Sequence, residues 1–495
     1  MSVLAGVTPS ERYLGQLCQR SFLRLWSHQN LFTDRGFNEA GEGKELCDLL
    51  VVFDNDVIIF SDKSCQFPNT GDVWLDWSRW YRKAIAKSAD QVFGAERWIA
   101  EHSSRIFTNR QCTERFPFPI PLPASARIHR VIVALGSKAR AEDYFGGNSR
   151  GSLMLASWLQ GNDHLTKGEM RRPFAVGQVN PQKGFVHVFD DITLDIVLSE
   201  LDTITDFVQY LTMKEWLFKQ VKYLSCAGEE DLLGFYLANL DEKGNFSHSG
   251  VDAAIADPSM AVFVTEGIWD QYCASDKAEF HRELRKNGEF IDHLIEVMTT
   301  HALAGTLAYG GEDGIAGQER NLRFLASEPR LSRALLAMGM MQKMATTPNN
   351  VRTSIVMESH WPDRVYVFLL FPRGAREAHK AYRSERQAAL TAYCYVVRHM
   401  KPELRYVIGF TTEPGSSSRR RSEDLMSFDF ADWTAEDDEN AIQAQKEMNI
   451  LTDYSHRSLL FGEPVTRRGD LRGGNRRERR KAKALARRYT SPRSS

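Results

Sequence analysis

Hydrophobic positions change their spacing several times along the N-terminal part of the chain. Over 10–27, leucine and phenylalanine recur at helical spacing, which predicts an amphipathic helix. Strands are predicted over 46–53 and 57–62; because 46–53 and 57–60 are apolar at nearly every position, the sequence predicts a hairpin buried on both faces. A long helix over 74–102 and a buried strand over 127–136 complete an order of helix, hairpin, helix and strand.

The remaining pattern divides the chain into four predicted parts. Further strands are expected at 152–158, 174–179 and 184–189, followed by one long helix over about 194–222. The chain is therefore predicted to be an α/β protein. Its expected parts are an α/β core over 1–190, a mainly helical region over 191–345, a smaller α+β region over 346–460 and a basic tail over 461–495 that is disordered when free.

Charge is distributed unevenly along the sequence. Between Arg467 and the C-terminus, twelve Arg and Lys residues face two acids, a net +10, while the whole chain has a formal net charge of −1. The rest of the chain therefore carries −11, and a basic segment on an acidic body is typical of a protein with an anionic partner. A solubilising terminus, or one that docks on the acidic body, is the alternative. The residues expected to contact nucleic-acid phosphates are Arg476, Arg477, Arg479, Arg480, Lys481, Lys483, Arg487 and Arg488.

Several protein classes find no support in the sequence. The seven cysteines are scattered, so no zinc-knuckle or iron–sulfur spacing occurs. No apolar run approaches the ~18 residues that would cross a bilayer, and the N-terminus lacks a secretory signal. Phosphate-loop, HExxH and GxSxG motifs are also missing. We therefore expect a cytoplasmic protein with no membrane contact.

The predicted hairpin "GKELCDLLVVFDNDVIIFSDKS" has ionisable groups at its far end. With Asn55 and Asp56 as the turn, Asp48 would lie opposite Lys63; with a three-residue turn over 54–56, it would lie opposite Asp62. The first register gives a carboxylate–lysine pair, and the second gives two carboxylates that could share a divalent cation. The alternative is an ordinary ion pair at the end of a hairpin, worth under ~1 kcal/mol.

With Asp48 and Lys63 on neighbouring strands and a helix before and after them, residues up to about 140 resemble the PD-(D/E)xK, or restriction-endonuclease-like, nuclease superfamily. The resemblance implies an αβββαβ core and hydrolysis of phosphodiester bonds in DNA with Mg²⁺ or Mn²⁺. Asp48 would bind the metal and Lys63 would position the attacking water. The stretches "SFLRLWSHQN" and "IIFSDKS" also resemble uncharacterised bacterial proteins, and by analogy alone the activity could serve in defence against foreign DNA.

The sequence departs from the family pattern at Ser61, where the resemblance requires an acid two residues before Lys63. Asp62, brought round by a β-bulge, or Glu45 would have to act as the second acid and metal ligand. Targeting would then require a homodimer or a partner protein. Otherwise the nuclease fold serves nucleic-acid binding or scaffolding without catalysis, and a third hypothesis is RNA binding through the tail. The supporting site residues that the resemblance implies are Glu11 on the first helix and Gln91 on the second.

Two further groups of residues could bind nucleic acid or a metal. An aromatic set is interleaved with Arg and Lys, as in surfaces that stack on bases, but its helical spacing favours core packing. His187 lies close to Asp190 and Asp191 at a strand end, where a metal site is conceivable and a strand-to-helix cap is favoured. The aromatic set consists of Trp74, Trp77, Trp80, Tyr81 and Trp98.

Overall fold

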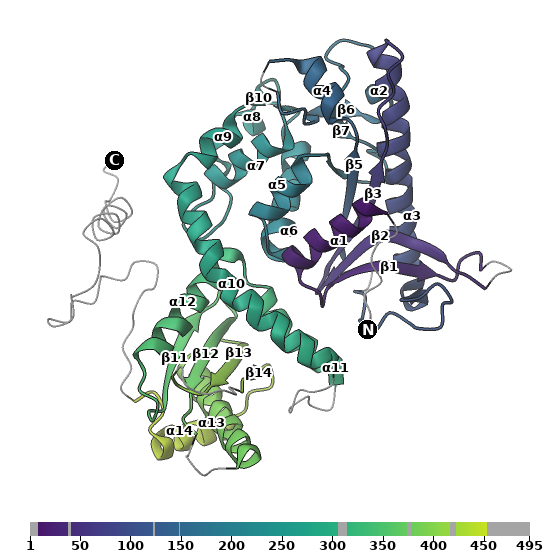
Figure 1. Cartoon of the computed structure of the whole chain (residues 1–495). Coiled ribbons are helices and arrows are strands. Elements are labelled where there is room, and N and C mark those ends of the chain that lie inside the picture. The colour runs from purple at the N-terminus through teal and green to yellow at the C-terminus, as the bar shows by residue number, and fades with distance from the viewer. Residues whose placement is uncertain are drawn as a thin grey trace, which may run out of the picture.

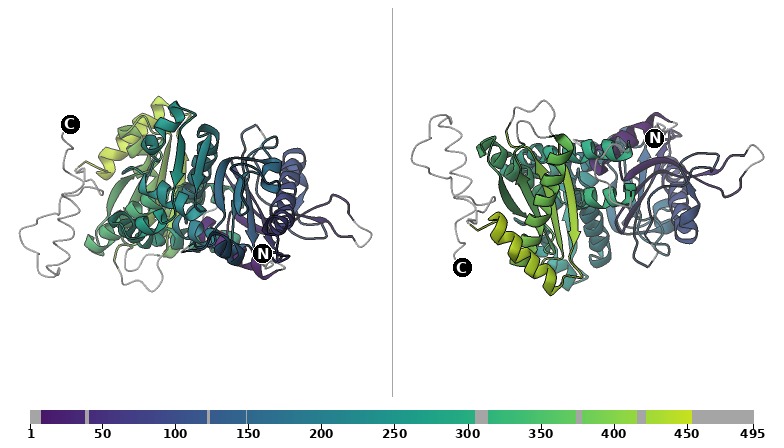
Figure 2. Two further views of the ribbon diagram at one scale, coloured as in Figure 1. Left: turned by 90° about the horizontal axis from the view of Figure 1, so that it is seen from above. Right: turned by 90° about the horizontal axis from the view of Figure 1, so that it is seen from below.

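A computed structural model provides the structure of the protein, and the residues that it describes are 8–37, 41–121, 124–147, 149–304, 314–373, 378–415 and 422–452. The described chain is a mixed α/β protein whose strands form three sheets. Figure 1 shows the first sheet with helices on both of its faces, and the last sheet on the far side of the long helix α10. Figure 2 shows these two α/β parts side by side. No helix among the described residues is both long and apolar enough to cross a membrane.

The first sheet has six strands in the order β4-β1-β2-β3-β5-β8. β1, β2 and β3 form an antiparallel meander, β5 lies parallel to β3, and β8 lies parallel to β5. The elements are α1 (Pro9–Phe22), β1 (Ser27–Thr33), β2 (Lys44–Phe53), β3 (Asp56–Ser64), α2 (Val73–Tyr81), the π-helical segment η1 (Arg82–Ala86), α3 (Lys87–His102), η2 (Ser103–Arg105), β4 (Ile106–Phe107), β5 (Arg127–Leu135), α4 (Lys138–Phe145) and β8 (His187–Phe189).

Both faces of the β2–β3 hairpin are buried, as the run of apolar residues predicts. Phe60 packs with Phe22 of α1 on one face, where α5 and α6 also lie. Leu50 and Ile59 pack on the other face against α3. Figure 1 shows this layered arrangement, with α2 and α3 along one side of the sheet. The end of the hairpin that carries the acids therefore lies in the middle of a covered sheet.

The hairpin register differs from both predicted registers, which are wrong. Phe53 pairs with Asp56 and Leu49 with Phe60, so the turn consists of Asp54 and Asn55 alone. The cause is the left-handed backbone of Asp54, with a φ of 52°, which closes the turn one residue earlier than expected. Continued by one pair, this register puts Asp48 opposite Ser61, not opposite Lys63 or Asp62. Asp56 is the first strand residue and is buried, not a turn residue.

β1 and an irregularity in its pairing with β2 also differ from prediction. β1 was not predicted, because it begins with the polar run "SHQN" that shows no strand alternation. Its pairing with β2 shifts between Leu31 and Phe32, which pair with Cys47 and Glu45, so Leu46 is an extra residue. The irregularity thus lies in β2 just before Asp48, and not at Asp62 in β3.

A second sheet, of order β10-β9-β6-β7, joins strands from both sides of residue 190. The single helix expected over 194–222 is two helices, because Thr203 caps a new helix after a break at Leu201. The elements are β6 (Met154–Gln160), η3 (Gly161–Leu165), β7 (Ala175–Gln178), α5 (Thr193–Glu200), α6 (Ile204–Gln220), β9 (Tyr223–Cys226), α7 (Glu229–Ala238), η4 (His248–Gly250), α8 (Asp252–Ala256), β10 (Ala261–Val264), α9 (Ile268–Cys273), α10 (Asp276–Leu303), α11 (Gly314–Ala326) and α12 (Arg330–Thr346).

The last sheet has the order β11-β12-β13-β14, with β12 and β13 parallel and both outer pairs antiparallel. Val367 and Leu369 of β12 pack against α13 and α14, while Tyr366 and Phe368 face the core shared with α11 and α12. The elements are β11 (Thr353–Glu358), β12 (Arg364–Leu370), α13 (His379–Met400), β13 (Tyr406–Thr412), β14 (Asp424–Asp429) and α14 (Ala435–Met448). The predicted basic tail falls outside the described residues.

Candidate functional site

Asp48 and the end of β3 are joined by a hydrogen bond. The Asp62 backbone N–H donates to Asp48 Oδ2 at 2.6 Å. The Ser61 hydroxyl donates to Gln91 Oε1 of α3 at 3.3 Å and also lies near enough to Asp48 to lower the pKa of that carboxyl. The structure thus brings together Asp48 and Gln91, which the resemblance selects, and Ser61, which departs from the family pattern but is a possible supporting residue.

Asp62 points to the opposite side of the sheet from Ser61, because neighbouring strand residues alternate in direction. It lines a cavity of about 140 Å³ with Ser10 and Tyr13 of α1. Both carboxylate oxygens are buried and have no hydrogen-bond partner, although the nearby Ser10 hydroxyl lowers the pKa. Burial is the larger effect and raises the pKa of Asp62 above its usual value. An unsatisfied buried carboxylate is costly, and a bound cation would remove that cost.

Asp48 has a strongly perturbed pKa. Burial is the main cause and raises it to about 6, while the Asp62 N–H lowers it. The charges of Glu11 and Asp62 raise it further. Glu45, near the start of β2, has its pKa raised to about 7, first by burial of its carboxyl group and next by the charges of Asp48 and Glu11. Four carboxylates therefore repel one another at this end of the hairpin, and we call Glu11, Glu45, Asp48 and Asp62 the acidic cluster.

Glu11 also has a structural role. Thr8 is the N-cap of α1, and its backbone N–H donates to Glu11 Oε2 at 3.1 Å in a capping box. Capping alone therefore explains a glutamate at this position. Its charge nevertheless raises the pKa of Glu45, Asp48 and Asp62, so it is a member of the acidic cluster on electrostatic grounds.

Lys63 is half-buried near the end of β3. Among the described residues it forms no ion pair within 4 Å, although its charge lowers the pKa of Asp62. Arg110 also lies near the cluster, and its charge lowers the pKa of Glu45.

The acidic cluster does not form a closed ligand set. Across the described residues, one group of three ligand atoms lies within 4.8 Å of one another, and it consists of His129, His187 and Glu215. These residues lie at the other end of the first sheet, near Asp56. Sequence analysis missed His129 and Glu215, since one is a single histidine in a buried strand and the other lies on a helix 28 positions after His187.

The other sequence candidates have structural roles. Asp190 accepts hydrogen bonds from the Ile192 and Thr193 N–H groups at 3.0 and 3.1 Å, and Asp191 accepts from the N–H groups at the start of α4. Both act as caps, as favoured by the sequence. Of the aromatic set, Trp77, Trp80 and Tyr81 are buried in one core cluster, while Trp74 packs against that cluster and Trp98 against a neighbouring one.

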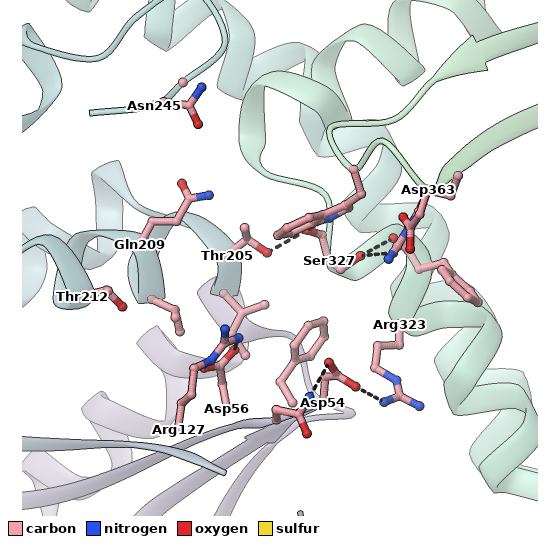
Figure 3. A pocket seen from close by; sticks show the side chains of 18 of the residues that line it. Asp54, Asp56, Arg127, Thr205, Gln209, Thr212, Asn245, Arg323, Ser327 and Asp363 are labelled. Carbon is pink, nitrogen blue, oxygen red and sulfur yellow. Dashed lines mark hydrogen bonds and ion pairs between the residues drawn. The ribbon is translucent and has the colours of Figure 1, made fainter. Parts of the chain in front are cut away.

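A large pocket of about 1130 Å³ opens where the hairpin turn meets α6, α11 and the last sheet (Figure 3). Figure 3 shows Asp54 of the turn paired with Arg323 of α11, at 2.8 Å, and the Thr205 hydroxyl donating to the Ser327 carbonyl oxygen at 2.7 Å. Its polar walls also carry Asp56, Arg127, Gln209, Thr212, Asn245 and Asp363. This pocket lies at the turn end of the hairpin, and the acidic cluster lies at the other end.

Comparisons with protein-family models, with curated proteins and with solved structures each gave no match.

Proposed function

We propose that the chain is a metal-dependent nuclease that hydrolyses phosphodiester bonds in DNA. The observation that carries the proposal is the placement of Asp48 and Lys63 on neighbouring strands, at one end of a sheet built in the order α1-β1-β2-β3-α3-β5. With α2, η1, η2 and β4 as additions, this order is compatible with the αβββαβ core that the resemblance to the PD-(D/E)xK superfamily implies. The raised pKa values of Glu45, Asp48 and Asp62, which a bound cation would lower, support the same proposal.

Each residue has a definite role in this proposal. Asp48 binds Mg²⁺ or Mn²⁺, hard cations that prefer carboxylate and water oxygens. The cation polarises the phosphoryl oxygen and lowers the pKa of the attacking water. Lys63, without an ion-pair partner in the described chain, orients that water. Glu45 or Asp62 supplies the second carboxylate: Glu45 is partly accessible to solvent, whereas Asp62 is buried and unsatisfied.

The experiment is cleavage of supercoiled and linear DNA by the purified full chain with Mg²⁺ or Mn²⁺. We expect cleavage by the wild type and at least a hundredfold loss in Asp48→Asn and Lys63→Met. Glu45→Gln and Asp62→Asn identify the second ligand, because only the variant that removes this ligand loses metal-dependent cleavage. Asp257→Asn, an exposed acid distant in sequence, is the matched control and should cleave normally.

A specific observation favours one alternative, a nuclease fold that binds nucleic acid without cutting it. Ser61 stands where the family pattern has an acid, and the neighbouring Asp62 side chain faces α1 rather than α3. If the wild type and all variants are equally inert with either cation but retain salt-sensitive DNA binding, the catalytic proposal is wrong and the binding function stands.

A further inference from the structure

Three potential metal ligands come together at the turn end of the first sheet. His129 lies on β5 and His187 on β8, and these strands run parallel with His187 opposite Val131. Residues two apart on a strand share a face, so both imidazoles lie on the same side of the sheet. α6 crosses this side and contributes Glu215, whose side chain is 36% exposed. Three separate elements therefore converge on one point at the edge of the protein.

The distances match those around a small metal ion. His187 Nε2 lies 2.9 Å from Glu215 Oε1, and His129 Nδ1 lies 3.7 Å from the same oxygen. Around a tetrahedral zinc ion with bonds of about 2.0–2.1 Å, neighbouring ligand atoms are roughly 3.3 Å apart. The two observed separations fall on either side of this value. Small side-chain movements would bring all three atoms to bonding distance.

The surroundings of His129 provide independent support. Its Nε2 lies 3.3 Å from Asp56 Oδ1, and Arg127 holds the same carboxylate at 2.7 and 2.6 Å through both of its oxygens. When Nε2–H donates to Asp56, the lone pair of Nδ1 points towards Glu215. Nδ1 is buried without a hydrogen-bond partner, because 3.7 Å is too long for one. A histidine that binds a metal through one ring nitrogen usually donates a hydrogen bond from the other, often to a carboxylate, which fixes the orientation of the ring.

We propose that His129 Nδ1, His187 Nε2 and the Glu215 carboxylate bind a divalent first-row transition-metal ion such as Zn²⁺, with Asp56 positioning His129. Two imidazoles select such ions over Mg²⁺, so this site differs in chemistry from the acidic cluster. Three protein ligands leave at least one position for water or substrate, the pattern of catalytic zinc sites. The proposal does not depend on the nuclease proposal.

A metal-free alternative is a charged His129 held between Asp56 and Glu215 as a structural ion-pair network. A direct measurement separates the two possibilities, because only the metal site predicts stoichiometric metal binding. The test is titration of the full chain with Zn²⁺ by isothermal calorimetry, after treatment with a chelator. Replacement of Zn²⁺ by Co²⁺ adds a spectrum that reports ligand type, since thiolate ligation by any of the free cysteines would give intense charge-transfer bands.

We expect one Zn²⁺ per chain, a Co²⁺ spectrum without thiolate bands, and a higher Tm with Zn²⁺ than without it. Glu215→Gln and His129→Gln should lower affinity at least a hundredfold, and Asp56→Asn should lower it about tenfold to a hundredfold without changing stoichiometry. His102→Gln and Asp257→Asn, outside the site, should bind Zn²⁺ as the wild type does.

Failure of the wild type to bind Zn²⁺ stoichiometrically, thiolate bands with Co²⁺, or unchanged affinity in Glu215→Gln would each overturn the proposal. Glu215 lies on a partly exposed helix surface, so its glutamine variant should fold even if His129→Gln does not. Far-ultraviolet circular dichroism of each variant shows whether the fold is kept.

Discussion

Replacing Asp48 with asparagine is expected to stabilise the metal-free protein while removing metal binding. Burial, with the charges of Glu11 and Asp62, raises the pKa of this carboxyl from 3.8 to about 6. A folded-state pKa above the unfolded value means that the folded protein holds the proton more tightly. Stability is therefore highest at low pH and falls as pH rises from about 4 to about 6, where the carboxyl ionises.

The magnitude follows from the shift. A difference of about two pKa units, at ~1.4 kcal/mol each, corresponds to at most about 3 kcal/mol above pH 6. Asp48 keeps some contact with solvent, and screening reduces the expected gain to about 1–2 kcal/mol. Asparagine has the same shape, and its side-chain oxygen can still accept the Asp62 N–H, so packing and hydrogen bonding are retained.

The assay is thermal unfolding of wild type and Asp48→Asn at pH 8 in EDTA and again in Mg²⁺. In EDTA the variant should unfold at a Tm a few degrees higher, and at pH 4 the two proteins should unfold together. Mg²⁺ should raise the Tm of the wild type but not that of the variant. A lower Tm for Asp48→Asn in EDTA at pH 8 would refute the reasoning, because it would make Asp48 a stabilising residue of the hairpin.

Three further experiments test the packing and electrostatics of the chain. Trp80→Ala, which empties a fully buried site, should lower the free energy of unfolding by about 3–5 kcal/mol in urea denaturation. Lys214→Met leaves the buried Glu229 carboxylate without its ion-pair partner, with only the Tyr210 hydroxyl donating to it, and should cost about 3–5 kcal/mol. Adding Glu229→Gln should recover most of this loss; equal losses in the single and the double variant would argue against a coupled pair. Asp56 is buried, yet its pKa is lowered because His129 and Arg127 outweigh burial, so its contribution is present above pH 4 and lost as pH falls below that value. Asp56→Asn should therefore lower the Tm at pH 7 and make little difference near pH 2, as measured by thermal unfolding across pH.

The regular parts of the fold could be predicted from the sequence because their signal is local. The hairpin with two buried faces, the helix after it and the strand at 127–136 all follow from residues within a few positions of one another. The turn "DND" could not be assigned, because Asp and Asn both tolerate the left-handed backbone and three closures are possible. The structure uses Asp54 for it, and the whole register follows from that choice.

The candidate sites were predictable to different extents. Asp48 and Lys63 lie on adjacent strands of one hairpin, so their proximity follows from local sequence. The pairing of His187 with β5 depends on the sheet order, and the contact with Glu215 depends on the path of α6. Neither is encoded in residues that are neighbours along the chain. A histidine in a buried strand, such as His129, gives no sequence signal of its own.

The two candidate metal sites lie at opposite ends of one strand, since β3 contributes Asp62 to the acidic cluster and Asp56 to the histidine site. Six residues of extended strand separate Asp56 from Asp62 by roughly 20 Å, about twice the distance over which salt screens exposed charges. Their ligands also differ, with oxygens alone at one end and imidazoles at the other. The ions should therefore be separable: a chelator selective for Zn²⁺ should strip the histidine site and leave Mg²⁺-dependent cleavage unchanged. Loss of cleavage under that treatment would mean that the imidazole site and the acidic cluster act as one catalytic unit, coupled along β3.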